Sequence, residues 1–124
     1  MRQHFGPRRR LRTAAEFDAV FKRGVRRGGR LFLLVVAENP LRFDRIGLAV
    51  SRRVGGAVAR NRARRLLRES FRRLPREGRK GRDVVVVAHP EIVNCEQAEV
   101  DRELRERLRT VPPGRGSAPA AVAR

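Results

Sequence analysis

The sequence predicts a small α+β protein with a single domain, and three observations lead to this prediction. The chain has 124 residues, which is within the usual size range of one domain. Its apolar residues gather in segments with either helical or strand-like periodicity. These segments follow the order helix, strand, strand, long basic helix, buried strand, helix, which is typical of an α+β domain with a split β-α-β core.

The first predicted element is a helix at residues 13–23, which follows a basic arm at residues 1–12. Thr13 is a favourable N-cap, and Glu16 completes a capping box with it. Gly24 suits the position just after the end of the helix. The arm itself contains five arginines, no acidic residue and no apolar periodicity, so no secondary structure is predicted there.

Two strands are predicted next, at residues 31–38 and 45–51, and their short connection favours an antiparallel hairpin. The second strand alternates large apolar residues with small ones, so one of its faces is flat. The small residues on that face are Gly47, Ala49 and Ser51. Either a neighbouring helix packs on this face or another molecule approaches it closely, and the spacing alone slightly favours the helix.

Residues 58–74 are predicted to form a helix with an apolar stripe opposite a basic arc. The stripe consists of Ala59, Ala63, Leu66, Leu67, Phe71 and Leu74. The arc consists of Arg60, Asn61, Arg64, Arg65, Arg68 and Arg72. Arginines at every fourth position repel one another by about 0.2–0.5 kcal/mol per pair. We therefore expect an anionic partner to relieve this repulsion.

The last elements are a strand at residues 83–88 and a helix at residues 96–109. Four consecutive valines predict that the strand is buried on both faces and lies inside the sheet. Residues 110–124 contain prolines, glycines and small residues, so a flexible tail is expected. The predicted organisation is an arm at 1–12, a folded domain at 13–109 and a tail at 110–124.

The charge of the chain points to a polyanionic partner. There are 31 Lys and Arg residues against 13 Asp and Glu, a net charge of +18. Residues 52–82 contribute +11 of this charge and the arm contributes +5, so the charge is directed rather than uniform. Nucleic acid is the first expected partner and an acidic membrane surface the second.

Several classes of protein are excluded. One cysteine, Cys95, cannot form an internal disulfide, and no Cys and His residues have zinc-ligand spacing. The longest apolar run, at residues 31–37, is too short to cross a bilayer, and no signal peptide is recognisable. No residues have the spacing of a catalytic, metal-binding or nucleotide-binding motif, so we expect neither catalytic residues nor metal ligands. A cytoplasmic RNA-binding protein fits better than a DNA reader, because the basic helix lacks a mixed set of base-reading residues.

The stretch at residues 47–69 reads GLAVSRRVGGAVARNRARRLLRE. It closely resembles the signature of the bacterial ribonuclease P protein family, in which a strand ending in V-S-R-R precedes a glycine-containing turn and a helix with an Arg-Asn-Arg motif. Arg10 with Leu11, and Phe17 with Phe21, also resemble the family's N-terminal segment. The resemblance covers about residues 8–109.

The resemblance implies a fold with a left-handed βαβ crossover that places the Arg-Asn-Arg helix across the sheet. It implies two partners, the catalytic RNA of ribonuclease P and precursor tRNA, whose 5′ leader is removed. The RNA is expected to carry the chemistry with Mg²⁺, which is consistent with a protein that has no cofactor of its own. No membrane and no DNA is expected as a partner.

The family motif assigns roles to three groups of residues. Those expected to contact the catalytic RNA are Arg52, Arg60, Asn61, Arg62, Arg64, Arg65 and Arg68. Those expected to line a cleft for the leader are Phe17, Phe21, Val35, Gly47, Ala49, Ser51 and Arg53. The arginines of the arm are Arg8, Arg9, Arg10 and Arg12. Val35 departs from the family, which often has an aromatic residue there, so base stacking at this point is expected to be weaker.

Two other classes of function remain open on composition. A ribosomal protein or general RNA chaperone would explain the charge and size equally well, but not the ordered motif. A cationic membrane-active protein would need an exposed apolar face opposite the arginines, whereas the stripe at residues 58–74 is more simply explained as core.

Overall fold

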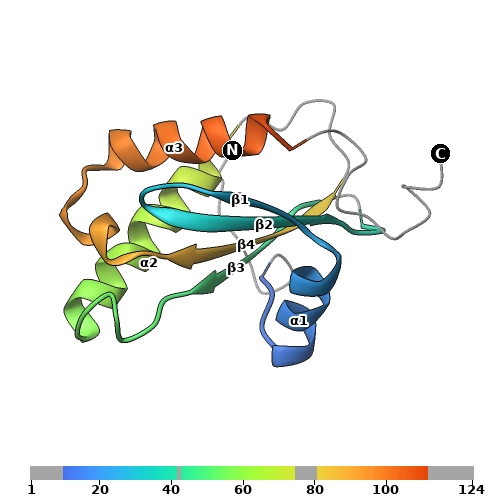
Figure 1. Cartoon of the computed structure of the whole chain (residues 1–124), viewed down its shortest axis with the longest axis horizontal. Helices are drawn as coiled ribbons and strands as arrows, with labels where there is room; N and C mark the ends of the chain where they lie inside the picture. The colour runs from blue at the N-terminus through green and yellow to red at the C-terminus, as the bar shows by residue number, and fades with distance from the viewer. Residues whose placement is uncertain (1–9, 42, 75–80, 112–124) are drawn as a thin grey trace.

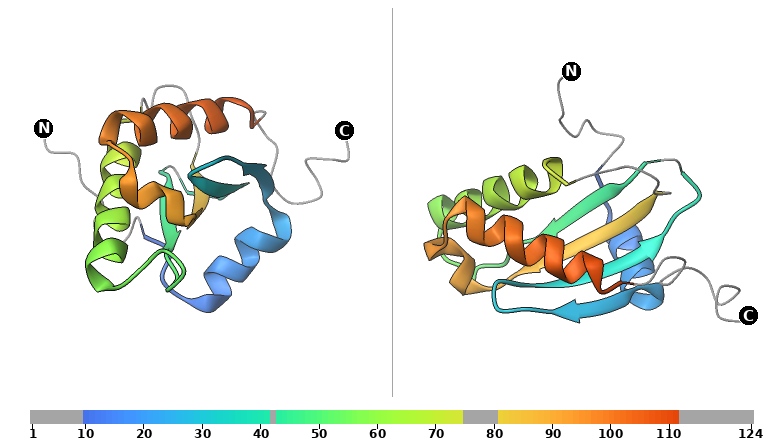
Figure 2. Two further views of the ribbon diagram at one scale, coloured as in Figure 1. Left: turned by 60° about the vertical axis from the view of Figure 1, so that its left-hand side comes forward. Right: turned by 90° about the horizontal axis from the view of Figure 1, so that it is seen from above.

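The computed structural model describes residues 10–41, 43–74 and 81–111. Within these ranges the secondary structure consists of α1 (Ala14–Arg23), β1 (Val25–Gly28), β2 (Phe32–Glu38), β3 (Arg45–Ala49), α2 (Ala57–Arg72), β4 (Arg82–Ala88), the 3₁₀ helix η2 (Pro90–Asn94) and α3 (Gln97–Arg109). Helices α2 and α3 cover one face of the sheet and α1 lies against the other (Figures 1 and 2). The predicted α+β domain is confirmed.

The sheet has the strand order β1-β2-β4-β3 and is mainly antiparallel. The prediction that β4 lies inside the sheet is confirmed, because it pairs with both β2 and β3. The predicted hairpin between β2 and β3 is wrong, since β4 lies between them. The all-valine stretch of β4 buries apolar surface on both faces, and residues 39–44 are long enough to pass over one strand, a step of ~10 Å.

Strands β3 and β4 are parallel neighbours and are joined by α2, so they form the βαβ crossover that the resemblance implies. The left hand of this crossover stays a prediction. On its outer edge, β3 is accompanied by the end of the arm: Arg10 bridges Ile46, and the Leu11 N–H donates to the Ile46 carbonyl at 2.9 Å. Arg8 and Arg9 lie outside the described residues, as does most of the predicted tail.

The apolar residues form a core on each face of the sheet, and the strands alternate between the two cores. The larger core lies beneath α2 and α3 and includes Ile46 together with the buried stripes of both helices. The smaller core lies beneath α1 and consists of Leu11, Val20, Val35, Ala37 and Val85, with Phe17, Phe21, Leu33 and Val87 packed around it. The apolar stripe of the basic helix is thus part of the protein interior.

The start of α1 is capped as predicted. The Glu16 N–H donates to Thr13 Oγ1, and the Thr13 N–H donates to Glu16 Oε1, both at 3.1 Å. Gly24 follows the helix, but with an extended backbone at φ −78° rather than a left-handed one. Its small size matters because a Cβ there would lie 2.6 Å from the Val20 carbonyl oxygen and from Val35 Cγ1. The glycine lets the chain pass close to the sheet as it turns into β1.

Two elements were not predicted. Strand β1 has the sequence VRRG, in which only Val25 reaches a core, so it carries no strand-like apolar pattern. It exists because β2 offers a partner edge, with Val25 opposite Val36. The 3₁₀ helix η2 begins at Pro90, where the sequence indicated only the end of β4.

Candidate nucleic-acid interface

Helix α2 presents a group of arginines that form no ion pair with any acidic residue in the described part of the chain. Asn61, Arg65 and Arg68 are exposed, whereas Arg60 and Arg64 are half-buried. Arg64 Nη1 donates to Asn61 Oδ1 at 3.0 Å. Among the described residues, no salt bridge involves Arg60, Arg64, Arg65 or Arg68. The side of the helix that the motif assigns to RNA therefore has uncompensated positive charge.

The arm adds to this charge. The pKa of Arg68 is lowered, first by burial and then by the nearby positive charges of Arg10 and Arg64. Arg10 is brought there by the bridge that it forms with β3. We call this group the basic helix surface, and it consists of Arg10, Arg60, Asn61, Arg64, Arg65 and Arg68. The repulsion of Arg68 by both Arg10 and Arg64 favours the binding of a polyanion.

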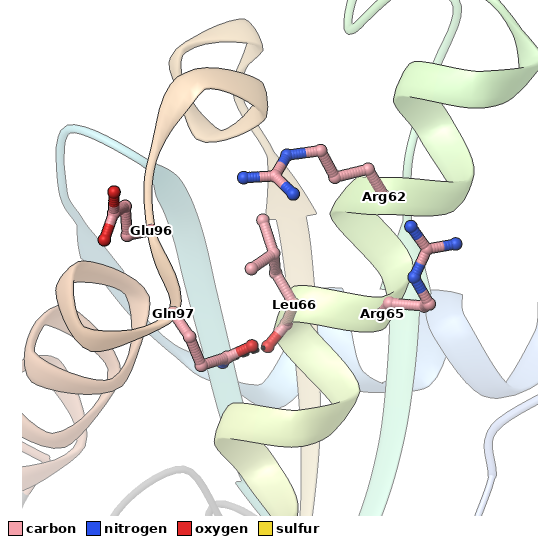
Figure 3. Close-up of a pocket in the computed structure, with 5 residues that line it drawn as sticks. All are labelled: Arg62, Arg65, Leu66, Glu96 and Gln97. Carbon is pink, nitrogen blue, oxygen red and sulfur yellow. Dashed lines mark hydrogen bonds between the residues drawn. The ribbon is translucent and has the colours of Figure 1, made fainter.

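Arg62 differs from its neighbours, because its guanidinium is bound within the protein. Its Nε donates to the Val93 carbonyl at 2.8 Å and its Nη2 to the Cys95 carbonyl at 2.7 Å. Figure 3 shows Arg62 reaching from α2 toward the segment that precedes α3. These two hydrogen bonds attach η2 to α2. The resemblance assigned Arg62 to the catalytic RNA, but in the structure two of its three side-chain nitrogens donate to the protein's own backbone.

Beside Arg62 lies an open hollow of about 410 Å³ between α2 and the start of α3. It is lined by Arg62, Arg65, Leu66, Glu96 and Gln97 (Figure 3). Gln97 Nε2 donates to the Leu66 carbonyl at 2.9 Å. Two residues that line the hollow therefore also join the two helices.

The far end of α2 is neutralised. Glu69 forms salt bridges with both Arg72 and Arg73, and Arg73 Nη1 also reaches Asp101 Oδ2 at 2.8 Å. The row of arginines at every fourth position, which was predicted to run through Arg72, is therefore uncompensated only as far as Arg68. The pKa of Arg72 is raised by its hydrogen bond to Glu69.

A buried polar network fixes α3 against α2. The Ser70 hydroxyl bonds to Asp101 Oδ1, and Gln97 Nε2 donates to Ser70 Oγ at 2.8 Å and to Asp101 Oδ1 at 3.1 Å. Burial raises the pKa of Asp101, but the hydrogen bonds from Ser70, Gln97 and Arg73 outweigh it, so the pKa is lowered overall. The carboxylate is therefore held in its charged form inside the helix interface.

The turn between β3 and α2 carries two further exposed arginines, Arg52 and Arg53. Ser51 Oγ accepts a hydrogen bond from the Arg53 N–H at 3.3 Å, and the Ser51 carbonyl accepts one from the Val54 N–H at 3.1 Å. Gly55 has φ +146°, which L side chains rarely adopt, so a glycine is needed here. The turn is thus a defined structure that presents both arginines just before the start of α2.

The sheet face opposite α2 and α3 is only partly covered by α1. The cross-strand row of Arg26, Val35, Val85 and Gly47 lies next to α1. The following row on the same face consists of Gly28, Leu33, Val87 and Ala49. We call the latter the open sheet row, because Gly28 is exposed and the other three are half-buried. Neither Leu33 nor Val87 was predicted as a site residue, since each lies in a strand that reads as continuous core.

The structure divides the residues that were predicted to line a cleft. Phe17 and Phe21 are half-buried at the edge of α1, Ala49 is in the open sheet row, and Ser51 and Arg53 are exposed. Val35 is fully buried under α1, and Gly47 is buried beneath the Phe17 ring, so neither presents surface to a ligand. This corrects the predicted lining. A helix does pack on the flat face of β3 at Gly47, while the same face is accessible at Ala49 and Ser51.

An ion-pair cluster holds α1 in this position. Arg45 on β3 donates from Nε and Nη2 to the two carboxylate oxygens of Asp83, each at 2.8 Å, and its Nη1 lies 3.7 Å from Glu16 Oε2. The hydrogen bond to Asp83 raises the pKa of Arg45. Backbone hydrogen bonds from Arg12 and Thr13 lower the pKa of Glu16. The first turn of α1 is thereby attached to the sheet beside Phe17.

No other site emerges from the described residues. Among them, no group of three or more His, Cys, Asp or Glu side chains is placed to hold a metal ion. The helices within the described ranges are all too short or too polar to span a membrane. The Cys95 thiol is buried, and this burial raises its pKa, which disfavours the reactive thiolate.

Two sequence comparisons, one with protein-family models and one with curated proteins, both match the chain to ribonuclease P proteins. A protein-family model described as Ribonuclease P matches residues 5–111. The ribonuclease P protein component of Geobacillus thermodenitrificans is 37% identical over 101 residues, which cover 81% of this chain and 84% of that protein. The ribonuclease P protein component of Geobacillus kaustophilus is 38% identical over the same coverage.

Comparison with solved structures also matches the fold to ribonuclease P proteins. The RNase P protein from Thermotoga maritima superimposes with a TM-score of 0.72 at 29% identity, covering 83% of this chain and 97% of the other. The RNase P protein of Staphylococcus aureus gives a TM-score of 0.72 at 25% identity, with coverages of 82% and 93%.

Proposed function

The chain belongs to the family of bacterial ribonuclease P protein components, and from this membership we propose how its surfaces share the binding of RNA. As a protein component of the ribonuclease P holoenzyme it serves the processing of precursor tRNA. The finer proposal has two parts. The basic helix surface binds the catalytic RNA, and the open sheet row with the edge of α1 binds the 5′ leader. The chemistry belongs to the RNA and its Mg²⁺ ions, in the cytoplasm.

One observation supports the first part above all others, the grouping of Arg10, Arg64 and Arg68 without a carboxylate partner among the described residues. Bringing like charges together costs free energy. The binding of RNA phosphates offsets this cost, and it also releases counterions from the RNA. Arg52, Arg60, Asn61 and Arg65 lie on the same helix or on the turn before it. Arg62 contributes indirectly, by attaching η2 to α2.

The second part of the proposal rests on the shape of the open sheet row. It is an accessible apolar strip of sheet bordered by two aromatic side chains, Phe17 and Phe21. Aromatic rings at the rim of an apolar floor suit single-stranded RNA, because unpaired bases stack on them without regard to sequence. The exposed Arg53 lies on the turn that follows β3, where it is suited to reach the leader's phosphates.

The test is the processing of precursor tRNA by the cognate catalytic RNA at low Mg²⁺ concentration, with and without the protein. We expect the protein to increase the rate of leader removal, since its arginines reduce the need for metal ions to neutralise phosphate. Failure to enhance processing at any Mg²⁺ concentration would refute the proposal.

A pair of matched triple variants localises the effect. Replacing Arg64, Arg65 and Arg68 with Met removes three positive charges from the basic helix surface. Replacing the exposed Arg102, Arg105 and Arg109 with Met removes the same charge from α3. Only the first variant should lose the enhancement. Equal losses would show that net charge matters rather than this surface, and RNA that co-purifies as a mixed ribosomal population would favour a general RNA-binding protein.

A further inference from the structure

We propose that Arg26, on the outer strand β1, is a substrate-contacting residue that binds the leader after it has crossed the open sheet row. This inference rests on the proposed placement of the leader and extends it to the edge of the sheet. Arg26 is not part of the family motif quoted above and was not among the residues expected to line the cleft.

Arg26 lies on the edge strand β1, two residues before Gly28, at which the open sheet row ends. It pairs with Val35 across β1 and β2, so its side chain lies on the same face as α1 and the open sheet row. Unlike Val35, it is exposed. Strand β1 forms one edge of the sheet, and β3, which leads into α2, forms the other. A single strand that crosses the face from the basic helix surface therefore reaches Arg26 last.

The side chain of Arg26 is already held in place. Its guanidinium carbon stands 5.5 Å from the centroid of the Phe21 ring, within the range of a cation–π contact. Its Nη2 donates to the Phe21 carbonyl at 3.3 Å. The guanidinium is thus kept against an aromatic ring that already borders the proposed leader site, and its orientation is set before any RNA arrives.

Arg26 also keeps binding capacity that the protein does not use. Within the described residues, it forms no salt bridge, and only Nη2 has a hydrogen bond. Its other donors are available to a phosphate, and its plane can stack on a base. At β2 this chain has Val35, which is buried and offers no stacking surface. The exposed Arg26 guanidinium, held 5.5 Å from the Phe21 ring centroid, lies one strand further out.

This geometry predicts a dependence on leader length. From β3 to β1 the open sheet row is ~14 Å wide, because neighbouring strands lie ~4.8 Å apart. A short leader ends before it reaches β1, whereas a longer one reaches Arg26. A residue that acted only through general positive charge would affect both kinds of substrate equally.

The experiment measures the Kd of the assembled holoenzyme for precursor tRNAs whose leaders increase one nucleotide at a time. Arg26→Ala should match the wild type on the shortest leaders and bind the longest roughly tenfold more weakly, which is the effect of removing one base stack. Arg26→Lys keeps the charge but not the plane, so it should recover only part of the affinity. Arg102→Ala on α3 removes an exposed charge from the opposite side and should follow the wild type throughout.

Each result decides between the possibilities. If the wild type prefers long leaders and Arg26→Ala shows the same preference, the role of Arg26 is refuted while the leader site stands. If Arg26→Ala weakens binding equally at every length, Arg26 contributes only general charge and the inference is overturned. If the wild type shows no dependence on leader length, the leader site and Arg26 fail together. Melting temperatures of the variants confirm that each is folded.

Discussion

The ring of Phe17 lies directly over Gly47, so closely that a methyl group on the glycine would stand 2.7 Å from the tip of the ring. The same methyl group would be 3.1 Å from Leu11 Cβ. One small residue on β3 thereby fixes two things, how deeply α1 sits on the sheet and where the end of the arm passes. Both affect the aromatic border of the open sheet row.

Gly47→Ala should therefore destabilise the protein and weaken leader binding together. Moving Phe17 and Leu11 apart to admit the methyl group should lower the free energy of unfolding by about 1–3 kcal/mol, as overpacking does elsewhere. Urea unfolding measures the first effect and the Kd for a long-leader precursor tRNA the second. Gly28→Ala is the control for the unfolding measurement, because nothing lies within 4 Å of a Cβ there. A Gly47→Ala protein as stable as the wild type would show that α1 is not seated on β3 as described.

Arg62→Met should reduce stability rather than the electrostatic attraction to RNA. It leaves the carbonyls of Val93 and Cys95 without their donors, at a cost of about 1.5–3 kcal/mol. Arg65→Met provides the comparison, since Arg65 lies three residues further along the same helix and is exposed. It should unfold like the wild type but bind the catalytic RNA with a salt slope smaller by about one. If Arg62→Met instead leaves the stability unchanged and reduces the salt slope, Arg62 belongs to the RNA interface.

Reversing two charges on the basic helix surface should change the salt dependence of assembly. With Arg64→Glu and Arg65→Glu, fewer counterions leave the RNA on binding, so log K should fall less steeply with log salt concentration, by about 0.7–0.9 for each phosphate that the protein no longer neutralises. Filter binding across a salt series gives the slope. The double variant Arg105→Glu and Arg109→Glu on α3 has the same net charge and should keep the wild-type slope. An unchanged slope in the first variant would argue against α2 as the binding face.

The lowered pKa of Asp101 predicts a loss of stability in acid. Its carboxylate is charged and hydrogen-bonded in the folded state, so its contribution is complete above the unfolded pKa of about 4 and disappears as the pH falls through the lower folded value. Asp101→Asn should be less stable at pH 7, and the difference from the wild type should shrink as the pH falls below about 4. Urea unfolding at each pH measures this difference. A constant difference would mean that the carboxylate's charge is not what the network stabilises.

Much of the fold could be predicted from local patterns. The capping box of Thr13 and Glu16, the four valines of β4 and the apolar stripes of the helices each depend on neighbours close in sequence. The pairing of strands depends instead on competition between distant segments. β4, and not β3, pairs with one edge of β2. The other edge of β2 pairs with β1, which has almost no apolar pattern of its own.

The candidate site shows the same division. Which arginines lie on α2 followed from helical periodicity, and the family resemblance predicted their partner. What each guanidinium contacts did not follow, because Arg62 turns toward η2 and Arg72 toward Glu69. Likewise, Leu33 and Val87 became surface residues only because α1 stops short of their row, which depends on the tertiary position of α1 and not on either strand's sequence.

The place of β4 in the chain has a consequence for synthesis. Both β2 and β3 pair with this strand, yet it begins at Arg82, after α2 has been translated. A nascent chain that ends before β4 therefore has no complete sheet and no fixed position for its arginine-bearing helix. Pairing between segments so far apart is slow compared with helix formation. The arginine-bearing helix therefore leaves the ribosome before the strand that completes the sheet beneath it.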